Sequence, residues 1–178
     1  MTATETTPTL IPDFGDDAAT DRKLCFVCSK GSLDMAYPAL IMASGALNEG
    51  IETHIFFTFW GMDMIHKTTQ NEMKFTFMGN PAMHMGKGAA SMPQGLGGLP
   101  GMTWFATRML KNKIAELDVP EVPELMTMLH DMGATFWACK MSADMMDLTE
   151  EDFIEEVDGI INVGEFIEIS TDADIVFI

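Results

Sequence analysis

Cys139 is the residue whose type and position most suggest chemistry. It ends the apolar run 134–139 and is followed by Lys140 and Ser142. Such a run predicts a buried strand, and the residues after it suit a helix. The thiol is then expected at a strand end, where free helix N–H groups and the Lys140 ammonium favour thiolate over thiol. A thiolate is the nucleophilic form of cysteine; the alternative is a small buried hydrophobe.

Cys25 and Cys28 form a CxxC pair, which in other settings indicates redox chemistry or zinc binding. Here the pair lies in the apolar run 24–29, which predicts a strand. Residues three apart on a strand point to opposite faces, so the two sulfurs should not meet. One CxxC also supplies only half of a structural zinc site. We expect both cysteines to pack in the core.

The turn that follows this run faintly resembles a phosphate-binding loop. It contains Ser29, Lys30 and Gly31 but lacks the spacing of a P-loop, so it predicts a strand-to-helix turn. If the predicted strand 24–29 lies beside the strand that ends at Cys139, the backbone amides of this turn would help to bind an anion near the thiol. With Lys140 and Ser142, these three residues are the candidate anion- or substrate-binding set.

Met83, His84 and Met85 stand in a Met-, Gly- and Pro-rich stretch, 78–101, which has no helical or strand periodicity. Thioether and imidazole ligands suit Cu(I). The alternative is an adaptable apolar rim for a partner or another subunit, because methionine repacks cheaply. We favour the rim and predict no metal site and no cofactor. No paired carboxylates, Ser/His/Asp set or HExxH motif stands out.

Short apolar runs alternate with segments of helical spacing along the chain. The pattern predicts a single α/β domain over 22–178, with a mainly parallel sheet of about five strands and helices on both faces, a three-layer sandwich. Residues 1–21 are expected to form a flexible tail. The expected strands are 24–29, 51–60, 134–139, 158–164 and 174–178. The expected helices are 33–47, 62–67, 102–117, 122–132, 142–147 and 150–156, with 164–173 a helix or turn. Pro38 favours a late start for the first helix.

The formal net charge is −17, and no Lys or Arg occurs among 12 acidic residues from 141 to 178. Such a surface repels nucleic acid and anionic lipid, so neither is an expected partner. The acidity indicates a solvated surface, a high-salt habitat or a basic protein partner. No run of 18 apolar residues occurs, so no membrane span is expected. Few cysteines and the absence of a signal-peptide pattern at 1–21 predict a cytoplasmic protein.

Three segments together resemble the DsrE/DsrF/DsrH-like family, in particular its soluble DsrE2/DsrE3-type branch, which often carries the label "peroxiredoxin family protein". They read SKGSLDMAYPALIMA at 29–43, FFTFWGMDMI at 56–65 with the loop ending GLPGM at 98–102, and ACKMSADMM at 138–146 with DGIINVGEFI behind it. The resemblance covers about 22–178. No peroxidatic motif accompanies it.

The resemblance implies a DsrE-like fold, assembly into oligomers (a trimer or a multiple of it for this chain) and cytoplasmic sulfur trafficking. It implies that Cys139 carries sulfane sulfur as a persulfide and passes it to a carrier of the TusA or rhodanese type. We transfer no role to Cys25 or Cys28. Transfer needs a thiol of lowered pKa, partial exposure and a flexible rim. The alternatives are a non-enzymatic, oligomeric partner-binding module, and a Cu(I) or small-anion binder through His84.

Overall fold

The computed structural model describes residues 21–75 and 99–178 of the chain. The expected tail, apart from Asp21, lies outside the described residues. Most of the loop 78–101 does too, including Met83, His84 and Met85. The predictions made for these residues therefore stay predictions.

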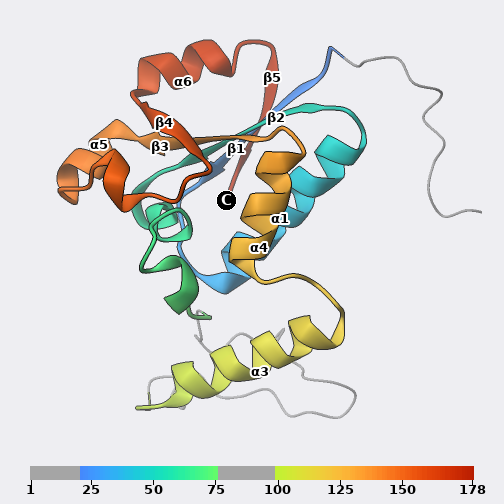
Figure 1. The fold of residues 1–178 in the computed structure, drawn as a ribbon, viewed down its shortest axis with the longest axis vertical. Coiled ribbons are helices and arrows are strands. Elements are labelled where there is room, and N and C mark those ends of the chain that lie inside the picture. Colours follow the sequence, from blue (N-terminus) through green and yellow to red (C-terminus); the bar gives the residue numbers. More distant parts are fainter. Residues whose placement is uncertain (1–20, 76–98) are drawn as a thin grey trace, which may run out of the picture.

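Five parallel strands form one sheet in the order β4-β3-β2-β1-β5 (Figure 1). They are β1 (Lys23–Cys28), β2 (Glu52–Phe57), β3 (Thr135–Cys139), β4 (Val157–Ile161) and β5 (Ala173–Phe177). The three central strands are largely buried on both faces, as expected for a parallel sheet covered on both sides. The predicted α/β class and the five-stranded parallel sheet are confirmed.

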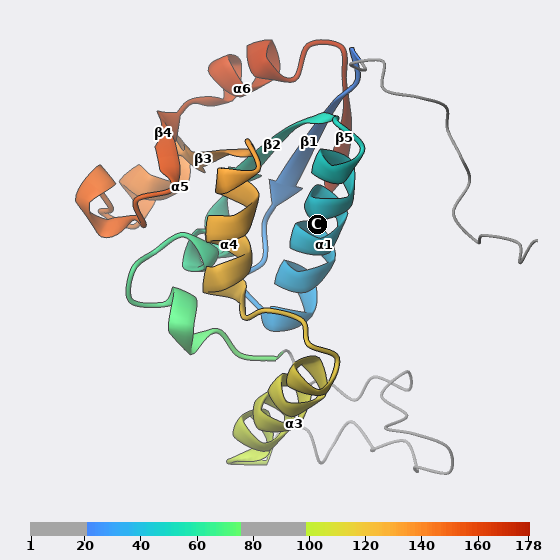
Figure 2. The same ribbon diagram turned by 45° about the vertical axis from the view of Figure 1, so that its right-hand side comes forward.

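Helices lie on both faces of this sheet, so the predicted layering is also confirmed. The helices are α1 (Leu33–Asn48), α3 (Met102–Glu116), α4 (Val122–Asp131), α5 (Lys140–Met145) and α6 (Val163–Ile169). Short 3₁₀ helices are η1 (Phe59–Met64), η2 (Gln70–Glu72) and η3 (Glu150–Asp152). Figure 2 shows α1 and α4 side by side on one face, α6 at the opposite side, and α3 below the body.

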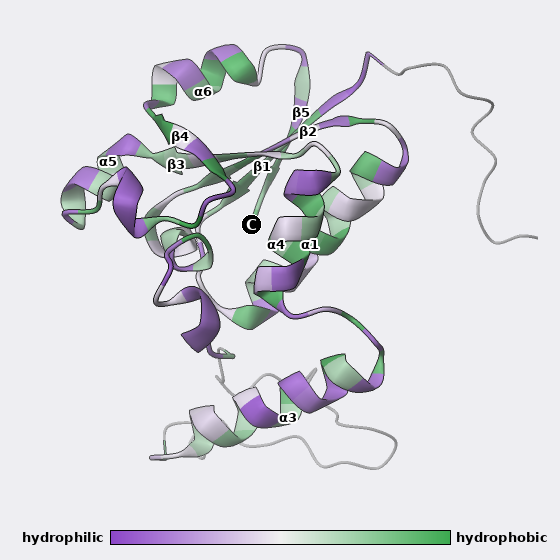
Figure 3. Ribbon diagram, viewed as in Figure 1, coloured by the Kyte–Doolittle hydropathy of each residue, from purple (hydrophilic) through white to green (hydrophobic). Residues whose placement is uncertain are grey.

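Two hydrophobic clusters hold the layers together, one on each side of the sheet. The larger cluster packs α1 and α4 against Phe26, Ile55 and Phe136. The smaller one packs α6, through Phe166, against the other face. The rings of Phe166 and Phe56 stack with centroids 4.4 Å apart. Figure 3 shows the hydrophobic colouring of the central strands between these helices. The smaller cluster includes Cys139, so the candidate nucleophile lies on the α6 side.

Several expected element boundaries are wrong. The expected strand 158–164 ends at Ile161, because α6 begins at Val163. The expected helices 62–67 and 150–156 are the 3₁₀ helices Phe59–Met64 and Glu150–Asp152. β2 ends at Phe57 instead of continuing to Trp60, because the chain from Phe59 to Met64 coils into η1. α1 begins at Leu33, so Pro38 lies inside the helix instead of in its first turn. Pro38 is on the exposed side of α1, where it does not disturb the buried face.

The end of β1 and the start of η1 approach each other at backbone distance. A Cβ atom on Gly61 would collide with the carbonyl oxygen of Cys28, and one on Gly31 would collide with that of Trp60. Backbone atoms cannot give way as the end of a flexible side chain does. Glycine at both positions is therefore needed to bring η1 against the carboxyl end of β1.

We expect Gly61→Ala to lower the free energy of unfolding by about 1–3 kcal/mol, the usual cost of overpacking. Urea unfolding followed by circular dichroism measures this. Gly45→Ala is the matched control, because nothing lies within 4 Å of a Cβ there. Gly45 sits inside α1, so alanine should raise stability by about 0.5–1 kcal/mol. Equal midpoints for the two variants would contradict the close approach.

Candidate functional site

Cys139 lies where the carboxyl ends of β2, β3 and β4 meet. It is the last residue of β3 and pairs in register with Ile161, the last residue of β4. On the other side, Phe57 pairs with Ala138, so the next residue along, Thr58, comes beside Cys139. The parallel register therefore brings Thr58 and Cys139 together, although they are far apart in the sequence.

A hydroxyl pair lies next to the thiol. The Oγ1 of Thr58 and the Oγ of Ser142 are 3.1 Å apart and buried. The backbone N–H of Phe59 donates to the Ser142 Oγ over 2.9 Å. Because Ser142 accepts this bond, its own proton is free to point elsewhere. Ser142 thus links the first turn of α5 to the start of η1 around Cys139.

The pKa of Cys139 is set by opposing effects. Burial raises the pKa, because it penalises the charged thiolate. Backbone N–H groups of Ser142 and Met141 and the hydroxyls of Ser142 and Thr58 lower it by hydrogen bonding to the sulfur. The hydrogen bonds win, and the pKa of Cys139 lies below its ordinary value. The expected lowering is present, with these hydrogen bonds as its cause.

The thiol itself is buried: Cys139 is only 2 % exposed, whereas sulfur transfer led us to expect partial exposure. It packs with Cys25, Val27 and Phe56. The neighbouring Phe59 has a φ of 47°, in the left-handed region that a bulky side chain rarely adopts. A partly exposed thiol is therefore not what this conformation presents, and the turn next to it is strained.

Lys140 does not have the expected electrostatic role. Its ammonium lies 3.3 Å from the carboxylate of Asp144, one helical turn along α5, and both side chains are exposed. The groups that lower the Cys139 pKa are hydrogen-bond donors, and Lys140 is not among them. The pair neutralises the cation that the sequence had placed beside the thiol.

The Ser29–Gly31 turn is not beside Cys139, since β2 lies between β1 and β3. Two strand spacings separate them, about 10 Å. The Ser29 hydroxyl and N–H both donate to the carbonyl of Ile178, which ties β1 to the C-terminal residue. Lys30 is exposed. The structure thus brings Ser142 to Cys139 and leaves Ser29, Lys30 and Gly31 apart from it.

Cys25 and Cys28 pack in different clusters on opposite faces of the sheet, as the strand spacing predicts. Both are free and buried. Burial raises the pKa of Cys25 to about 11 and that of Cys28 to about 12. Both thiols therefore stay protonated near neutral pH, and Cys139 is the thiol with the largest thiolate fraction.

Thr58 and the Phe59 N–H are the site groups that the sequence did not indicate. A signal for Thr58 existed: it is the polar residue directly after a strand, in a sheet expected to gather its site at the strand ends. Without the strand order it had no assigned neighbour. Within residues 21–75 and 99–178, no group of three or more His, Cys, Asp or Glu side chains suits a metal ion. In the same ranges, no helix combines the length and apolarity needed to cross a membrane.

The model of the DsrE/DsrF/DrsH-like family matches residues 20–178. The fold is a five-stranded parallel α/β sheet, and because the family model matches all five strands, the chain belongs to this family. The resemblance noted in the sequence is confirmed.

Two curated relatives and one solved structure show how far the similarity extends. The sulfur carrier protein DsrE2 of Allochromatium vinosum is 36% identical over 155 residues, which cover 86% of this chain and 96% of that protein. The uncharacterized protein YrkE of Bacillus subtilis is 29% identical over 138 residues, 77% of this chain and 84% of that one. A protein of unknown function from Methanobacterium thermoautotrophicum has a TM-score of 0.49 at 12% identity and covers 89% of this chain and 100% of its own.

We expect Ser142→Ala to raise the pKa of Cys139, because it removes a hydroxyl that stabilises the thiolate. The iodoacetamide alkylation rate of Cys139, followed by mass spectrometry from pH 5 to 10 (roughly spanning the range of cysteine pKa values), gives the midpoint. The midpoint should move up, so that alkylation slows at neutral pH and recovers at high pH. Thr58→Val should act in the same direction.

Lys140→Ala is the matched control for this experiment. Its ammonium is paired with Asp144, so the midpoint should stay where it is in the wild-type protein. If the midpoint shifts more in Lys140→Ala than in Ser142→Ala, the Lys140 cation is the main cause of the lowered Cys139 pKa, and the role of the hydroxyls is refuted.

Proposed function

We propose that this protein is a cytoplasmic sulfur carrier with sulfurtransferase activity, which holds sulfane sulfur as a persulfide on Cys139. The observation that supports this most directly is the lowered pKa of a thiol at the carboxyl end of the sheet. The name of the DsrE2 relative, a sulfur carrier protein, supports the choice of sulfur over other thiol chemistry. Three free cysteines fit a reducing compartment.

The proposed chemistry is thiol exchange without net redox change. The Cys139 thiolate attacks the terminal sulfur of a persulfide or polysulfide, a new S–S bond forms on Cys139, and the donor leaves as a thiolate. An acceptor thiolate then attacks the outer sulfur, and Cys139 leaves as a thiolate. Both steps profit from a low pKa at Cys139, as attacking group and as leaving group. The Ser142 and Thr58 hydroxyls would stabilise its charge each time.

The burial of Cys139 requires a local opening for each transfer. The segment best suited to move is the start of η1, where the strained Phe59 is held to Ser142 by one backbone hydrogen bond. Strained segments next to a site release free energy when they rearrange. A donor or acceptor that docks against this segment would then reach the sulfur. Sulfur-carrier proteins of the TusA or rhodanese type are the proposed partners.

We also propose that the protein forms a homo-oligomer through the apolar face of the sheet beside its edge strand β5. β5 is an edge strand, and its Ile175 and Phe177 pair in register with Cys25 and Val27 of the smaller cluster. The two side chains extend that apolar face but are 55 % and 72 % exposed. Exposed apolar side chains that continue a core are typical of a surface covered by another chain.

Incubation with polysulfide, followed by intact-mass measurement, tests the carrier function. The wild-type protein should gain the mass of one or more sulfur atoms, which dithiothreitol removes. Cys139→Ser should gain none. The double variant Cys25→Ala/Cys28→Ala is the control and should gain sulfur as the wild type does. An equal adduct on Cys139→Ser, or none on the wild type, would refute the proposal.

Size-exclusion chromatography with light scattering tests the proposed oligomer. The wild type should elute at a multiple of the 19.6 kDa chain mass, with a trimer or a multiple of it as the expected state. Ile175→Ser/Phe177→Ser should shift the protein toward the monomer. Leu117→Ser, which changes an equally exposed apolar residue at the end of α3, should not. A monomeric wild type would contradict self-association.

A further inference from the structure

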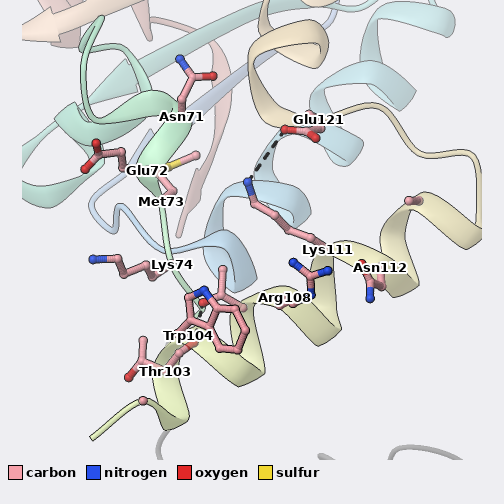
Figure 4. Close-up of a pocket in the computed structure, with 13 residues that line it drawn as sticks. Asn71, Glu72, Met73, Lys74, Thr103, Trp104, Arg108, Lys111, Asn112 and Glu121 are labelled. Carbon is pink, nitrogen blue, oxygen red and sulfur yellow. Dashed lines mark hydrogen bonds and ion pairs between the residues drawn. The ribbon is translucent and has the colours of Figure 1, made fainter.

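A cavity of about 870 Å³ lies between α3 and the segment that carries η2 (Figure 4). None of the residues that surround the Cys139 thiol lines it. Its size falls within the range of small-molecule sites, about 300–1,000 Å³. A cavity this large exceeds what an inorganic anion fills and suits an organic ligand.

The wall of this cavity has a charge opposite to that of the chain. Lys74, Arg108 and Lys111 line it, three of the ten basic residues in a chain of net charge −17. Among the residues that the structure describes, two carboxylates line it, those of Glu72 and Glu121. In a chain of strongly negative net charge, this local excess of positive charge favours an anion here over other parts of the surface.

Arg108 and Lys111 differ in how far they are already neutralised. The Lys111 ammonium lies 3.8 Å from the Glu121 carboxylate. Among the described residues, no carboxylate lies within ion-pair distance of Arg108, whose guanidinium instead sits over the Trp104 ring, 5.8 Å from its centroid. A guanidinium presents a planar fork of donors that matches phosphate and carboxylate. Arg108 is therefore the cation available to an incoming anion.

Trp104 adds a flat apolar surface beside this cation. It is 66 % exposed, unusual for a tryptophan, and in Figure 4 its ring lies next to Arg108. Trp104, Arg108 and Lys111 follow one another at helical spacing, so they share one face of α3 over about 10 Å. That face presents a stacking surface at one end and cations along the rest.

We propose that this cavity binds an organic anion of the size of a nucleoside monophosphate. Its ring stacks against Trp104, and its phosphate binds to Arg108 and, after partial displacement of Glu121, to Lys111. Charge-assisted hydrogen bonds to a guanidinium supply much of the affinity, and stacking on the indole supplies the preference for a ring. This site is independent of sulfur transfer by Cys139.

Titration calorimetry of the full chain with AMP tests the proposal, with adenosine and inorganic phosphate as the two part-ligands. AMP should bind at least about tenfold more tightly than either part, since only AMP offers both ring and anion. Quenching of tryptophan fluorescence by AMP should disappear in Trp104→Leu. No binding of AMP at millimolar concentration overturns the proposal. If adenosine binds as tightly as AMP, the phosphate contributes nothing to binding. If inorganic phosphate binds as tightly as AMP, the ring contributes nothing. Either result also overturns the proposal.

Variants on α3 separate this site from general charge effects. Arg108→Gln should weaken AMP binding by about tenfold or more, the value of a charge-assisted hydrogen bond. Lys113→Gln is the matched control, because Lys113 pairs with Glu116 and does not line the cavity. Glu121→Gln should strengthen binding by about two- to fivefold by releasing Lys111. Equal effects of Arg108→Gln and Lys113→Gln overturn the proposal, and circular dichroism verifies that each variant is folded.

Discussion

The parallel register of β2, β3 and β4 is the constraint on which the candidate site depends. Parallel strands end at the same edge, so a residue that closes one strand meets the residues that close its neighbours. The pairing of Ala138 with Phe57 and of Cys139 with Ile161 therefore fixes what surrounds the thiol. Glycine at position 61 then lets η1 turn back against β1 at this edge. Neither the hydroxyl pair nor the Phe59 N–H would reach the site in another strand order.

The three cysteines of this fold show how local hydrogen bonding decides the chemistry of a buried thiol. All three are free and buried, and burial raises the pKa of each. Cys25 lies within β1, where the backbone donors are used by the sheet ladder, and Cys28 ends β1 but is followed by a turn, since α1 begins only at Leu33. Cys139 lies where the ladder stops and a helix begins, so N–H groups and hydroxyls remain for its sulfur. A strand end that leads directly into a helix thus provides donors that a strand interior, or a strand end followed by a turn, does not.

The sequence predicted the layers of this fold well and the neighbours of Cys139 poorly. Apolar runs locate strands, because a buried parallel strand must be apolar on both faces. No local pattern in the sequence encodes which strands lie side by side in the sheet. The sequence therefore identified Cys139 and Ser142, which are three residues apart along the chain, and missed Thr58. It assigned Lys140 to the thiol because sequence distance says nothing of the competing carboxylate at Asp144.

Charge is distributed unevenly over the structure, and this separates its two candidate sites. From Met141 to Ile178 the chain carries 12 acidic residues and no lysine or arginine, and this segment contains most of α5, the helix that follows Cys139 directly. The basic side chains Arg108, Lys111 and Lys113 stand instead on α3, which Figure 1 shows away from the sheet. Free anions are repelled near Cys139 and attracted near α3. A sulfur donor for Cys139 should therefore arrive bound to a protein whose surface offsets this charge, whereas a small anion should bind at α3.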